Sequence, residues 1–239
     1  MTDPSAPSTP SAFPDADLPD ITVEQMREVD RIMVDELHIT LLQMMENAGR
    51  NLAELAIRHF TPVTCTVLAG PGGNGGGGLA AARHLANRGV AIEVVLSATD
   101  AVTDATAHQL DVLGRMSVPV VDEPRVPALV LDAVIGYSLT GDPHGRSAEL
   151  VGWANEVDAP TVSLDTPSGL DLASGRVGSP CVVADATLTL ALPKRGLRQA
   201  PTVVGTLFVA DIGVPPSVYD QLGIAVTAPF AAGTILRVR

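Results

Sequence analysis

The stretch that decides the fold is Val63-Thr64-Cys65-Thr66-Val67-Leu68-Ala69, followed by Gly70-Pro71-Gly72-Gly73-Asn74-Gly75-Gly76-Gly77-Gly78. The first part is apolar and β-branched, which predicts a short buried strand. The glycines predict a loop, because glycine adopts positive φ and lets a ligand approach the backbone closely. A helix over residues 79–88 follows, and free N–H groups at Gly78 and Leu79 would hold a phosphate or pyrophosphate. The alternative is a flexible turn that binds nothing.

The alternation of strand and helix extends outward from this stretch. Two amphipathic helices come first, and capping boxes predict their starts after Thr22 and Thr40. The expected strands span 63–69, 90–96, 118–121, 128–135, 161–164, 184–192 and 205–210, and helices at 79–88, 104–116 and 146–157 separate most of them. This order predicts an α/β fold with a mostly parallel sheet that is covered on both faces.

Composition narrows the class of protein. The chain has 239 residues, a net charge of −12 and a single lysine, Lys194, so its surface repels nucleic acid and anionic membranes. We expect a cytoplasmic protein, because no signal peptide or membrane-spanning run is visible. Residues 1–20 are proline-rich and are expected to be a disordered tail. One domain then spans 21–215, and 216–239 forms either an extension of it or a loose tail.

Polar residues follow the predicted strands, where ligands bind in such sheets. Asp132 interrupts an apolar strand end, and Asp165 ends another strand just before the turn that contains Ser168. Together with Asn74 they offer only oxygen ligands, which suit an alkali or alkaline-earth cation rather than zinc. The alternative is a pair of Asx-type turns without a metal. Lys194 is either a compact charge at the site or simple surface charge.

Several motifs in the same order resemble the NAD(P)H-hydrate epimerase family, which is also described by the YjeF N-terminal domain. They are Met26-Arg27-Glu28-Val29-Asp30-Arg31, Met45-Glu46-Asn47-Ala48-Gly49-Arg50, the glycine-rich segment with Leu79 to Leu85, Asp132-Ala133 with Gly136, Asp165-Thr166-Pro167-Ser168-Gly169, Pro193-Lys194-Arg195-Gly196-Leu197 and Asp211-Ile212-Gly213-Val214-Pro215. The resemblance covers residues 21–215. It is specific because the motifs occur together.

The resemblance implies a three-layer α/β/α Rossmann-like sandwich, often a homodimer, that interconverts the R and S forms of hydrated NADH and NADPH. It implies potassium bound by Asn74, Asp132 and Ser168, and Asp165 as the catalytic residue. The substrate-binding positions that it implies are Gly73, Asn74, Gly75, Gly76, Gly77, Gly136, Tyr137, Ser138, Leu139, Thr140, Gly141, Asp142 and Asp165. A dehydratase that uses ATP or ADP would be a separate protein, since we expect no room for it in this chain.

The chain departs from the family pattern G-x-G-N-N-G-G-D-G at two positions. Gly73 stands in place of the first asparagine, and Gly77 stands in place of the aspartate. A positioned acid or base contributes on the order of 10²–10⁴ in rate, so these departures motivate an alternative function. In that alternative the chain is a catalytically impaired relative that binds a nucleotide or serves as a protein-interaction scaffold. A dehydrogenase that uses intact NAD is a third class, which the loose fit to the dinucleotide fingerprint disfavours.

Overall fold

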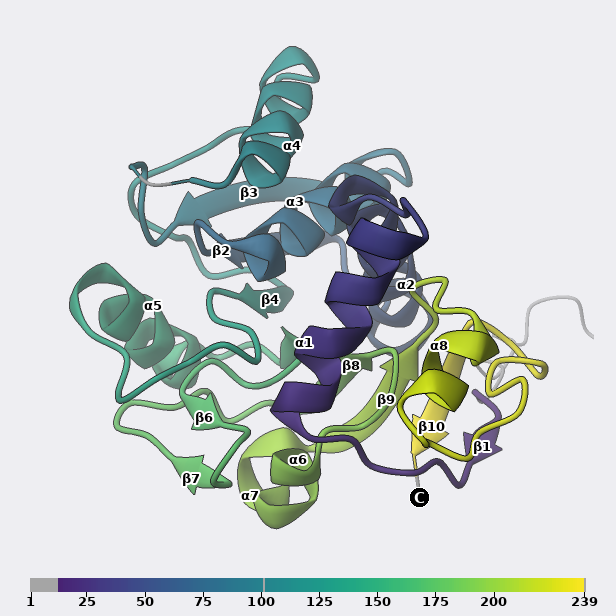
Figure 1. Ribbon diagram of the computed structural model, residues 1–239. Helices are drawn as coiled ribbons and strands as arrows, with labels where there is room; N and C mark the ends of the chain where they lie inside the picture. The colour runs from purple at the N-terminus through teal and green to yellow at the C-terminus, as the bar shows by residue number, and fades with distance from the viewer. Residues whose placement is uncertain (1–12, 101, 239) are drawn as a thin grey trace, which may run out of the picture.

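The computed structural model describes residues 13–100 and 102–238, which form one eight-stranded sheet with helices on both sides (Figure 1). The strand order is β1-β10-β9-β8-β5-β4-β2-β3. All neighbouring pairs are parallel except β10 and β9. A separate hairpin pairs β6 with β7. The expected three-layer α/β/α fold with a mostly parallel sheet is confirmed.

The strands of the large sheet are short and mostly buried. Their bounds are β1 Asp15–Ala16, β2 Thr64–Ala69, β3 Ala91–Leu96, β4 Leu129–Ala133, β5 Thr161–Leu164, β8 Ala186–Leu190, β9 Thr206–Ala210 and β10 Ile235–Val238, and the hairpin strands are β6 Leu170–Asp171 and β7 Arg176–Val177. The strand expected at 118–121 is reduced to a single bridge between Val94 and Val120.

The helices are α1 Val23–Arg31, the π-helical turn η1 Ile32–Glu36, α2 Leu41–Phe60, α3 Gly73–Ala86, α4 Asp104–Arg115, α5 Gly145–Glu156, α6 Arg195–Gln199, α7 Pro201–Val204 and α8 Pro216–Gln221. Both predicted capping boxes are present. The Thr22 hydroxyl accepts from Gln25 N and the Thr40 hydroxyl accepts from Gln43 N, while each glutamine side chain accepts from the cap residue's own N–H. Two donors are thus satisfied at each helix start.

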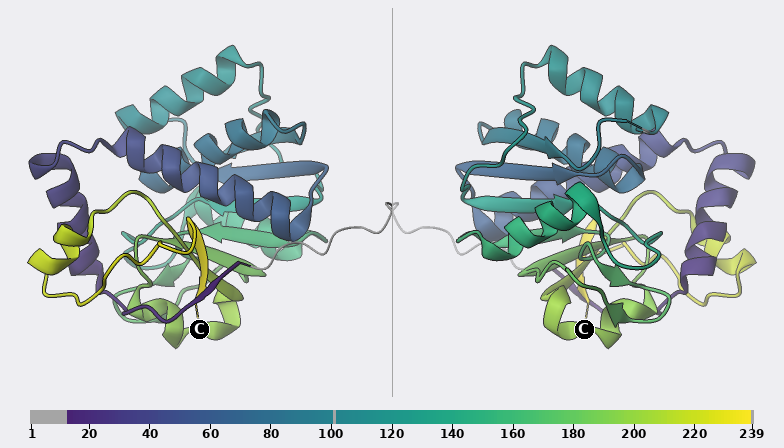
Figure 2. Two further views of the ribbon diagram at one scale, coloured as in Figure 1. Left: turned by 90° about the vertical axis from the view of Figure 1, so that its right-hand side faces the viewer. Right: turned by 90° about the vertical axis from the view of Figure 1, so that its left-hand side faces the viewer.

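The core is divided by the sheet. Helices α2, α3 and α4 pack on one face, where Leu52, Leu79 and Leu113 meet the β2 and β4 side chains. Helix α5 packs on the other face through Leu150 and Val151, and Figure 2 shows α2 and α5 on opposite sides of the sheet. Helices α1 and α8 form a further apolar cluster over the β9–β10 side.

The strand order predicts a crevice beyond the carboxyl ends of the central strands. From β2 the chain moves outward to β3 and then returns to β4 on the other side of β2. Ligands bind at such a switch point, beyond the carboxyl ends of the strands. The segments that follow β2, β4, β5 and β8 therefore meet at one end of the molecule.

The prediction that the glycine-rich segment is a loop up to Gly78 was wrong. Helix α3 begins at Gly73, so the glycines form its first turns. Each costs about 1 kcal/mol of helix propensity relative to alanine, but a larger residue has no room. A Cβ at Gly78 would lie 2.5 Å from Ala133 Cβ, and one at Gly75 would lie 1.8 Å from Gly70 O. Close packing on β4 and on the chain before the helix overrides propensity.

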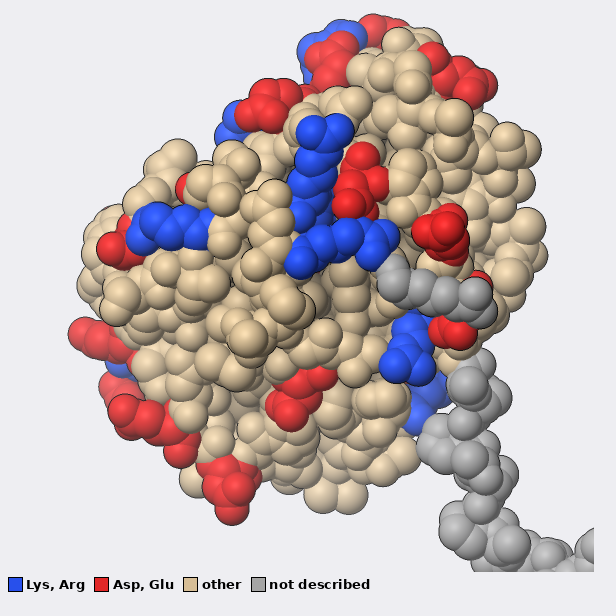
Figure 3. Space-filling view, turned by 90° about the horizontal axis from the view of Figure 1, so that it is seen from below, with Lys and Arg blue, Asp and Glu red and all other residues tan. Residues whose placement is uncertain are grey.

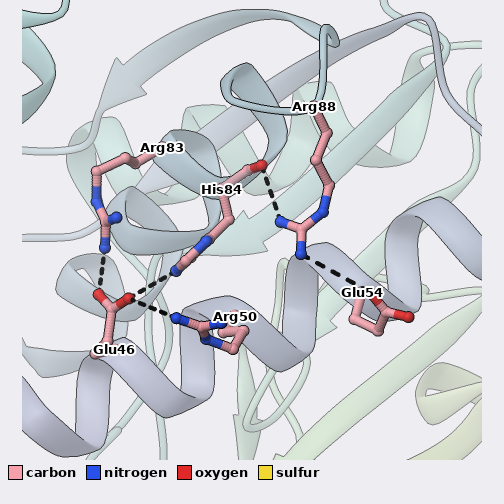
Figure 4. Close-up of polar contacts among 6 residues, drawn as sticks. All are labelled: Glu46, Arg50, Glu54, Arg83, His84 and Arg88. Atoms are coloured by element: carbon pink, nitrogen blue, oxygen red, sulfur yellow. Dashed lines mark hydrogen bonds and ion pairs between the residues drawn. The ribbon is translucent and has the colours of Figure 1, made fainter.

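A polar cluster joins α3 to α2 on the side away from the sheet (Figure 4). Glu46 accepts hydrogen bonds from Arg83 and from His84 Nε2, the latter at 2.8 Å. The guanidinium of Arg88 donates to His84 O at 3.0 Å. Burial lowers the pKa of His84, and the hydrogen bond to Glu46 opposes this only in part. The cluster holds a neutral, buried histidine between the two helices.

The segments at both ends of the described chain pack onto the sheet, although residues 1–20 were expected to be disordered. Residues 13–20 are ordered: β1 pairs with β10, and the side chains of Phe13 and Leu18 are buried. The expected disorder of residues 1–12 lies outside the described residues. At the other end, α8 and β10 belong to the same fold, because Val218 and Leu236 enter the core. Of the two alternatives for residues 216–239, the structure shows the extension of the domain and not the loose tail.

The face seen in Figure 3 carries acidic and basic side chains in small separate groups over a mostly uncharged surface. Within the described residues, no helix is long and apolar enough to cross a bilayer.

Candidate functional site

A cavity of about 560 Å³ lies at the carboxyl ends of β2, β4, β5 and β8. Its apolar wall includes methionines from α1 and α2, and its polar groups come from the segments after the strands. The lining residues used below are Met26, Asp30, Gly72, Gly73, Asn74, Gly77, Gly136, Tyr137, Ser138, Asp165 and Lys194. Apolar walls with a few converging polar groups are typical of a small-molecule site.

Asp165 is one of the polar residues that line this cavity. It follows β5 directly and adopts a left-handed backbone conformation, with φ of 66°. Its N–H donates to Leu188 O at 2.8 Å, which fixes the turn to the neighbouring strand β8. Left-handed conformations of residues other than glycine are uncommon and cluster at functional sites. The turn directs the Asp165 side chain away from the regular strand and into the cavity wall.

Lys194 is the charge partner of Asp165. Its ammonium donates to Asp165 Oδ1 at 2.6 Å, to Leu190 O at 2.7 Å and to Thr189 Oγ1 at 3.2 Å. The Lys194 side chain is fully buried. Three oxygens satisfy its three donors, as a buried ammonium requires. Of the two interpretations of this lysine, surface charge is therefore wrong.

Tyr137 connects Asp165 to a second carboxylate. Its backbone N–H donates to Asp165 Oδ2 at 3.2 Å, and its phenol donates to Asp30 Oδ2 at 2.5 Å. Burial raises the pKa of Asp30, and the Tyr137 hydrogen bond opposes that shift. Burial, and then the neighbouring Asp30, also raise the pKa of Tyr137. The phenol is therefore a hydrogen-bond donor at neutral pH.

Asp132 is a buried carboxylate behind the cavity wall. It accepts hydrogen bonds from Ser163 Oγ at 2.8 Å, from Ser168 N at 2.8 Å and from Ser168 Oγ at 2.5 Å. A weaker bond comes from Val134 N at 3.3 Å. Burial raises the pKa of Asp132 despite these bonds. Within the described residues no basic side chain forms an ion pair with it, so its negative charge has no nearby compensation.

The oxygen ligands expected for a cation converge on the turn after β4. The Ser168 hydroxyl accepts from Ile135 N at 2.8 Å, and Asn74 packs against Gly136, where an added Cβ would lie 3.2 Å from Asn74 Cβ. In the described part of the chain, the buried amide oxygen and nitrogen of Asn74 have no hydrogen-bond partner. The unpartnered Asn74 amide oxygen and the buried Asp132 carboxylate are hard oxygen ligands, a kind of ligand that suits a hard cation.

Other predicted positions divide into two groups. Gly73, Gly77 and Ser138 line the cavity as expected. Gly75 and Gly76 are absent from its lining: Gly75 packs against the backbone of Gly70, and Gly76 packs against Met45 and Thr106. Leu139, Thr140, Gly141 and Asp142 also lie outside the lining, and Asp142 instead pairs with Arg176 at 2.8 Å. Their contact with substrate remains a prediction.

Because α3 begins at Gly73, the N–H groups expected to bind phosphate lie earlier in the chain than predicted. The helix begins at Gly73, and Gly76 N already bonds to Gly72 O at 3.2 Å, so the free N–H groups belong to Gly73, Asn74 and Gly75. The Thr106 hydroxyl donates to Gly72 O at 2.9 Å and steadies this helix start. The N-terminal end that can hold an anion thus lies at the cavity, one and a half turns before the predicted position.

Asp30 was not among the predicted site residues. A signal for it exists in the sequence, since Met26, Asp30 and Met33 follow helical spacing on one face of the first helix. Both methionines are buried. A carboxylate within an apolar stripe is expensive unless it has a partner, so its place in the pattern indicates a role.

Comparisons with known proteins agree with this geometry. The family described as YjeF-related protein N-terminus matches residues 41–196. A protein of Dehalogenimonas lykanthroporepellens named NAD(P)H-hydrate epimerase is 48% identical over 91% of this chain and 91% of its own length. A protein of Salinibacter ruber named bifunctional NAD(P)H-hydrate repair enzyme Nnr is 38% identical, and the match spans 42% of its length. The crystal structure of yeast ynu0, YNL200c superposes with a TM-score of 0.80 at 24% identity, over 92% of this chain and all of that one.

Proposed function

Because the chain belongs to the family of YjeF-related protein N-terminal domains, we propose that it interconverts the R and S epimers of hydrated NADH and NADPH. The observation that carries the proposal is the buried Asp165–Lys194 pair in the wall of a cavity large enough for a nicotinamide ring. The relatives named as epimerases include proteins that match this chain over most of their own length.

The substrate carries a hydroxyl at C6 of the reduced nicotinamide ring. Loss of that hydroxyl as water and addition of water to the other face invert the centre. Asp165 is the group that takes a proton from the incoming water. Lys194 holds Asp165 Oδ1, and Tyr137 N holds Oδ2, so the carboxylate is fixed before substrate binds, as acid–base catalysis requires.

A potassium ion held by Asn74, Asp132 and Ser168 would supply positive charge at the strand ends and fix the turn after β4. The support is the unpartnered Asn74 amide and the uncompensated charge of Asp132. The side chains themselves orient this turn: the Ser168 hydroxyl bridges Ile135 N and Asp132. That bridge places Gly136 and Tyr137 along the cavity.

The N-terminal end of α3 would bind the pyrophosphate of the dinucleotide. Its free N–H groups and the positive end of its dipole favour an anion, and Gly72, Gly73 and Asn74 line the cavity. Gly73 and Gly77 supply neither the amide nor the carboxylate that the family pattern has at these two positions. The loss of these two side chains motivates the alternative function, in which the fold binds a nucleotide without converting it.

The S epimer formed in this reaction would be the substrate of another enzyme. Some relatives are named bifunctional NAD(P)H-hydrate repair enzymes, and this chain matches about two fifths of their length. We propose that a separate dehydratase that uses ATP or ADP consumes the S epimer. Epimerisation then returns the R form to that pool.

The test is conversion of purified R-NADHX and R-NADPHX, followed by chromatography in potassium buffer and in sodium buffer of equal ionic strength. The expected result is conversion well above the spontaneous rate, and faster in potassium. Asp165→Asn should reduce it to the spontaneous rate. If the folded protein binds nucleotide and converts neither substrate, the alternative function holds instead.

A further inference from the structure

We propose that Asp30, which accepts the hydrogen bond of the Tyr137 phenol, is a second catalytic carboxylate and acts on the C6 hydroxyl of the substrate. The proposal rests on the epimerase function and assigns a role to a residue on α1, far in sequence from the strand ends. Its basis is that Tyr137 joins the two carboxylates, its N–H to Asp165 and its phenol to Asp30.

The geometry gives the two carboxylates different surroundings in one cavity. Asp165 is held by the buried Lys194 ammonium and by a backbone N–H. Asp30 accepts only the Tyr137 phenol at Oδ2, and within the described residues its Oδ1 has no hydrogen-bond partner. Asp30 lines the cavity, so Oδ1 is free to meet a bound substrate. Carboxyls in contrasting environments are how sites divide acid and base roles.

The burial of Asp30 favours its role as the acid. The Lys194 ammonium at the strand ends lowers the pKa of Asp30, and the Asp165 carboxylate raises it. The hydrogen bond from Tyr137, in the turn after β4, also lowers it. Arg27 lies one turn earlier on α1. Burial is the largest influence and raises the pKa of Asp30. A raised value keeps a larger protonated fraction near neutral pH, which a general acid needs.

The step balances with water as the only other reactant. The Asp30 carboxyl donates its proton to the C6 hydroxyl as the C6–O bond breaks, and water leaves with the bonding pair. The lone pair of the ring nitrogen forms a C=N bond at C6. Water then adds to the opposite face of C6, the nitrogen regains its pair, and Asp165 accepts the proton released. Asp30 then regains a proton and Asp165 releases one, either in a turnover in the reverse direction or by exchange with solvent.

The experiment compares the unmodified protein with Asp30→Asn, Tyr137→Phe and the matched control Asp35→Asn. Asp35 is an exposed carboxylate on the next turn, in η1. The rate of R-NADHX epimerisation, corrected for the spontaneous rate, is measured from pH 5 to pH 9. Asp30→Asn should lower kcat by about 100-fold or more, with KM changed by less than about 3-fold, and Asp35→Asn should leave both constants unchanged.

The pH profile separates a catalytic role from a structural one. The rate of the unmodified protein should fall as pH rises through the pKa of Asp30, because its protonated form is the donor. Tyr137→Phe removes the hydrogen bond that lowers this pKa. The fall of the rate should therefore occur at higher pH in this variant. Full kcat for Asp30→Asn alongside an active unmodified protein overturns this role alone. Absence of conversion by the unmodified protein overturns the epimerase function as well.

Discussion

Lys194 Nζ and Asp165 Oδ1 lie 2.6 Å apart in a pair of side chains that are almost completely buried. Each residue follows a different strand, Asp165 after β5 and Lys194 after β8, and these strands are neighbours in the sheet. The pair therefore joins two adjacent strand ends at the cavity. Breaking one partner of such a pair leaves an uncompensated buried charge, which costs more than the pair contributes.

We expect Lys194→Met to lower the free energy of unfolding by about 3–5 kcal/mol, measured by urea denaturation. The loss arises from the lone Asp165 carboxylate, not from packing, because methionine has nearly the length of lysine. The double variant Asp165→Asn with Lys194→Met removes both charges and should recover part of the loss. A double variant no more stable than Lys194→Met would show that the charge of Asp165 is not the cause.

Gly77 stands where the family pattern has an aspartate, and a neighbouring leucine fills the space beside it. A Cβ at Gly77 would lie 2.8 Å from Leu164 Cδ2, so the leucine occupies the space of a side chain. Gly77→Asp should lower the free energy of unfolding by about 1–3 kcal/mol through overpacking. Leu164→Ala alone should cost about 2–5 kcal/mol through the cavity it leaves.

The two changes should be non-additive, because each relieves the defect of the other. The double variant is expected to be more stable than the sum of the single effects in a double-mutant cycle. Gly73→Asn is the matched control: a Cβ there meets only Met45 Cε at 3.6 Å, and the change should stay within about 0.5 kcal/mol. Strict additivity of Gly77→Asp and Leu164→Ala would contradict the close contact.

The helix start at Gly73 shows where local sequence signals fail. Polyglycine predicts a loop from propensity alone, and only the approach of α3 to Ala133 and to the backbone of Gly70 explains why glycine is required in the helix. That approach is a tertiary contact, which no window of sequence contains. The capping boxes at Thr22 and Thr40 were predictable because both partners lie three residues apart.

The site was predictable to the same extent. Asn74, Asp165 and Ser168 follow strands, and Asp132 lies near the end of β4. Parallel strands bring their carboxyl ends to one side of the sheet, so a contact such as that between Ser168 and Asp132 could be predicted. Asp30 reaches the cavity from a helix that packs across the strand ends. Its contact with Tyr137 joins positions 107 residues apart, and only the folded chain reveals it.

His84 should make stability depend on pH. Burial lowers the pKa of His84 in the folded state, whereas the unfolded histidine titrates near pH 6.5. Protonation therefore favours unfolding, and the free energy of unfolding should fall as pH drops below about 6.5. His84→Gln should flatten this dependence in urea denaturation between pH 5 and pH 8, and His108→Gln, at an exposed position on α4, should not. An unchanged slope for His84→Gln would place the pH dependence elsewhere.

Asp132 should determine whether potassium stabilises the fold. A ligand that binds only the folded state raises the melting temperature with its concentration, so replacing sodium by potassium at constant ionic strength should raise it for the unmodified protein. Asp132→Asn removes the buried negative charge that attracts the ion, while the Ser168 N–H can still donate to the amide oxygen. The variant should lose the potassium effect, whereas Asp142→Asn, at the exposed pair with Arg176, should keep it. An equal potassium effect in Asp132→Asn would exclude this carboxylate as a ligand and leave Asn74 without its proposed partner.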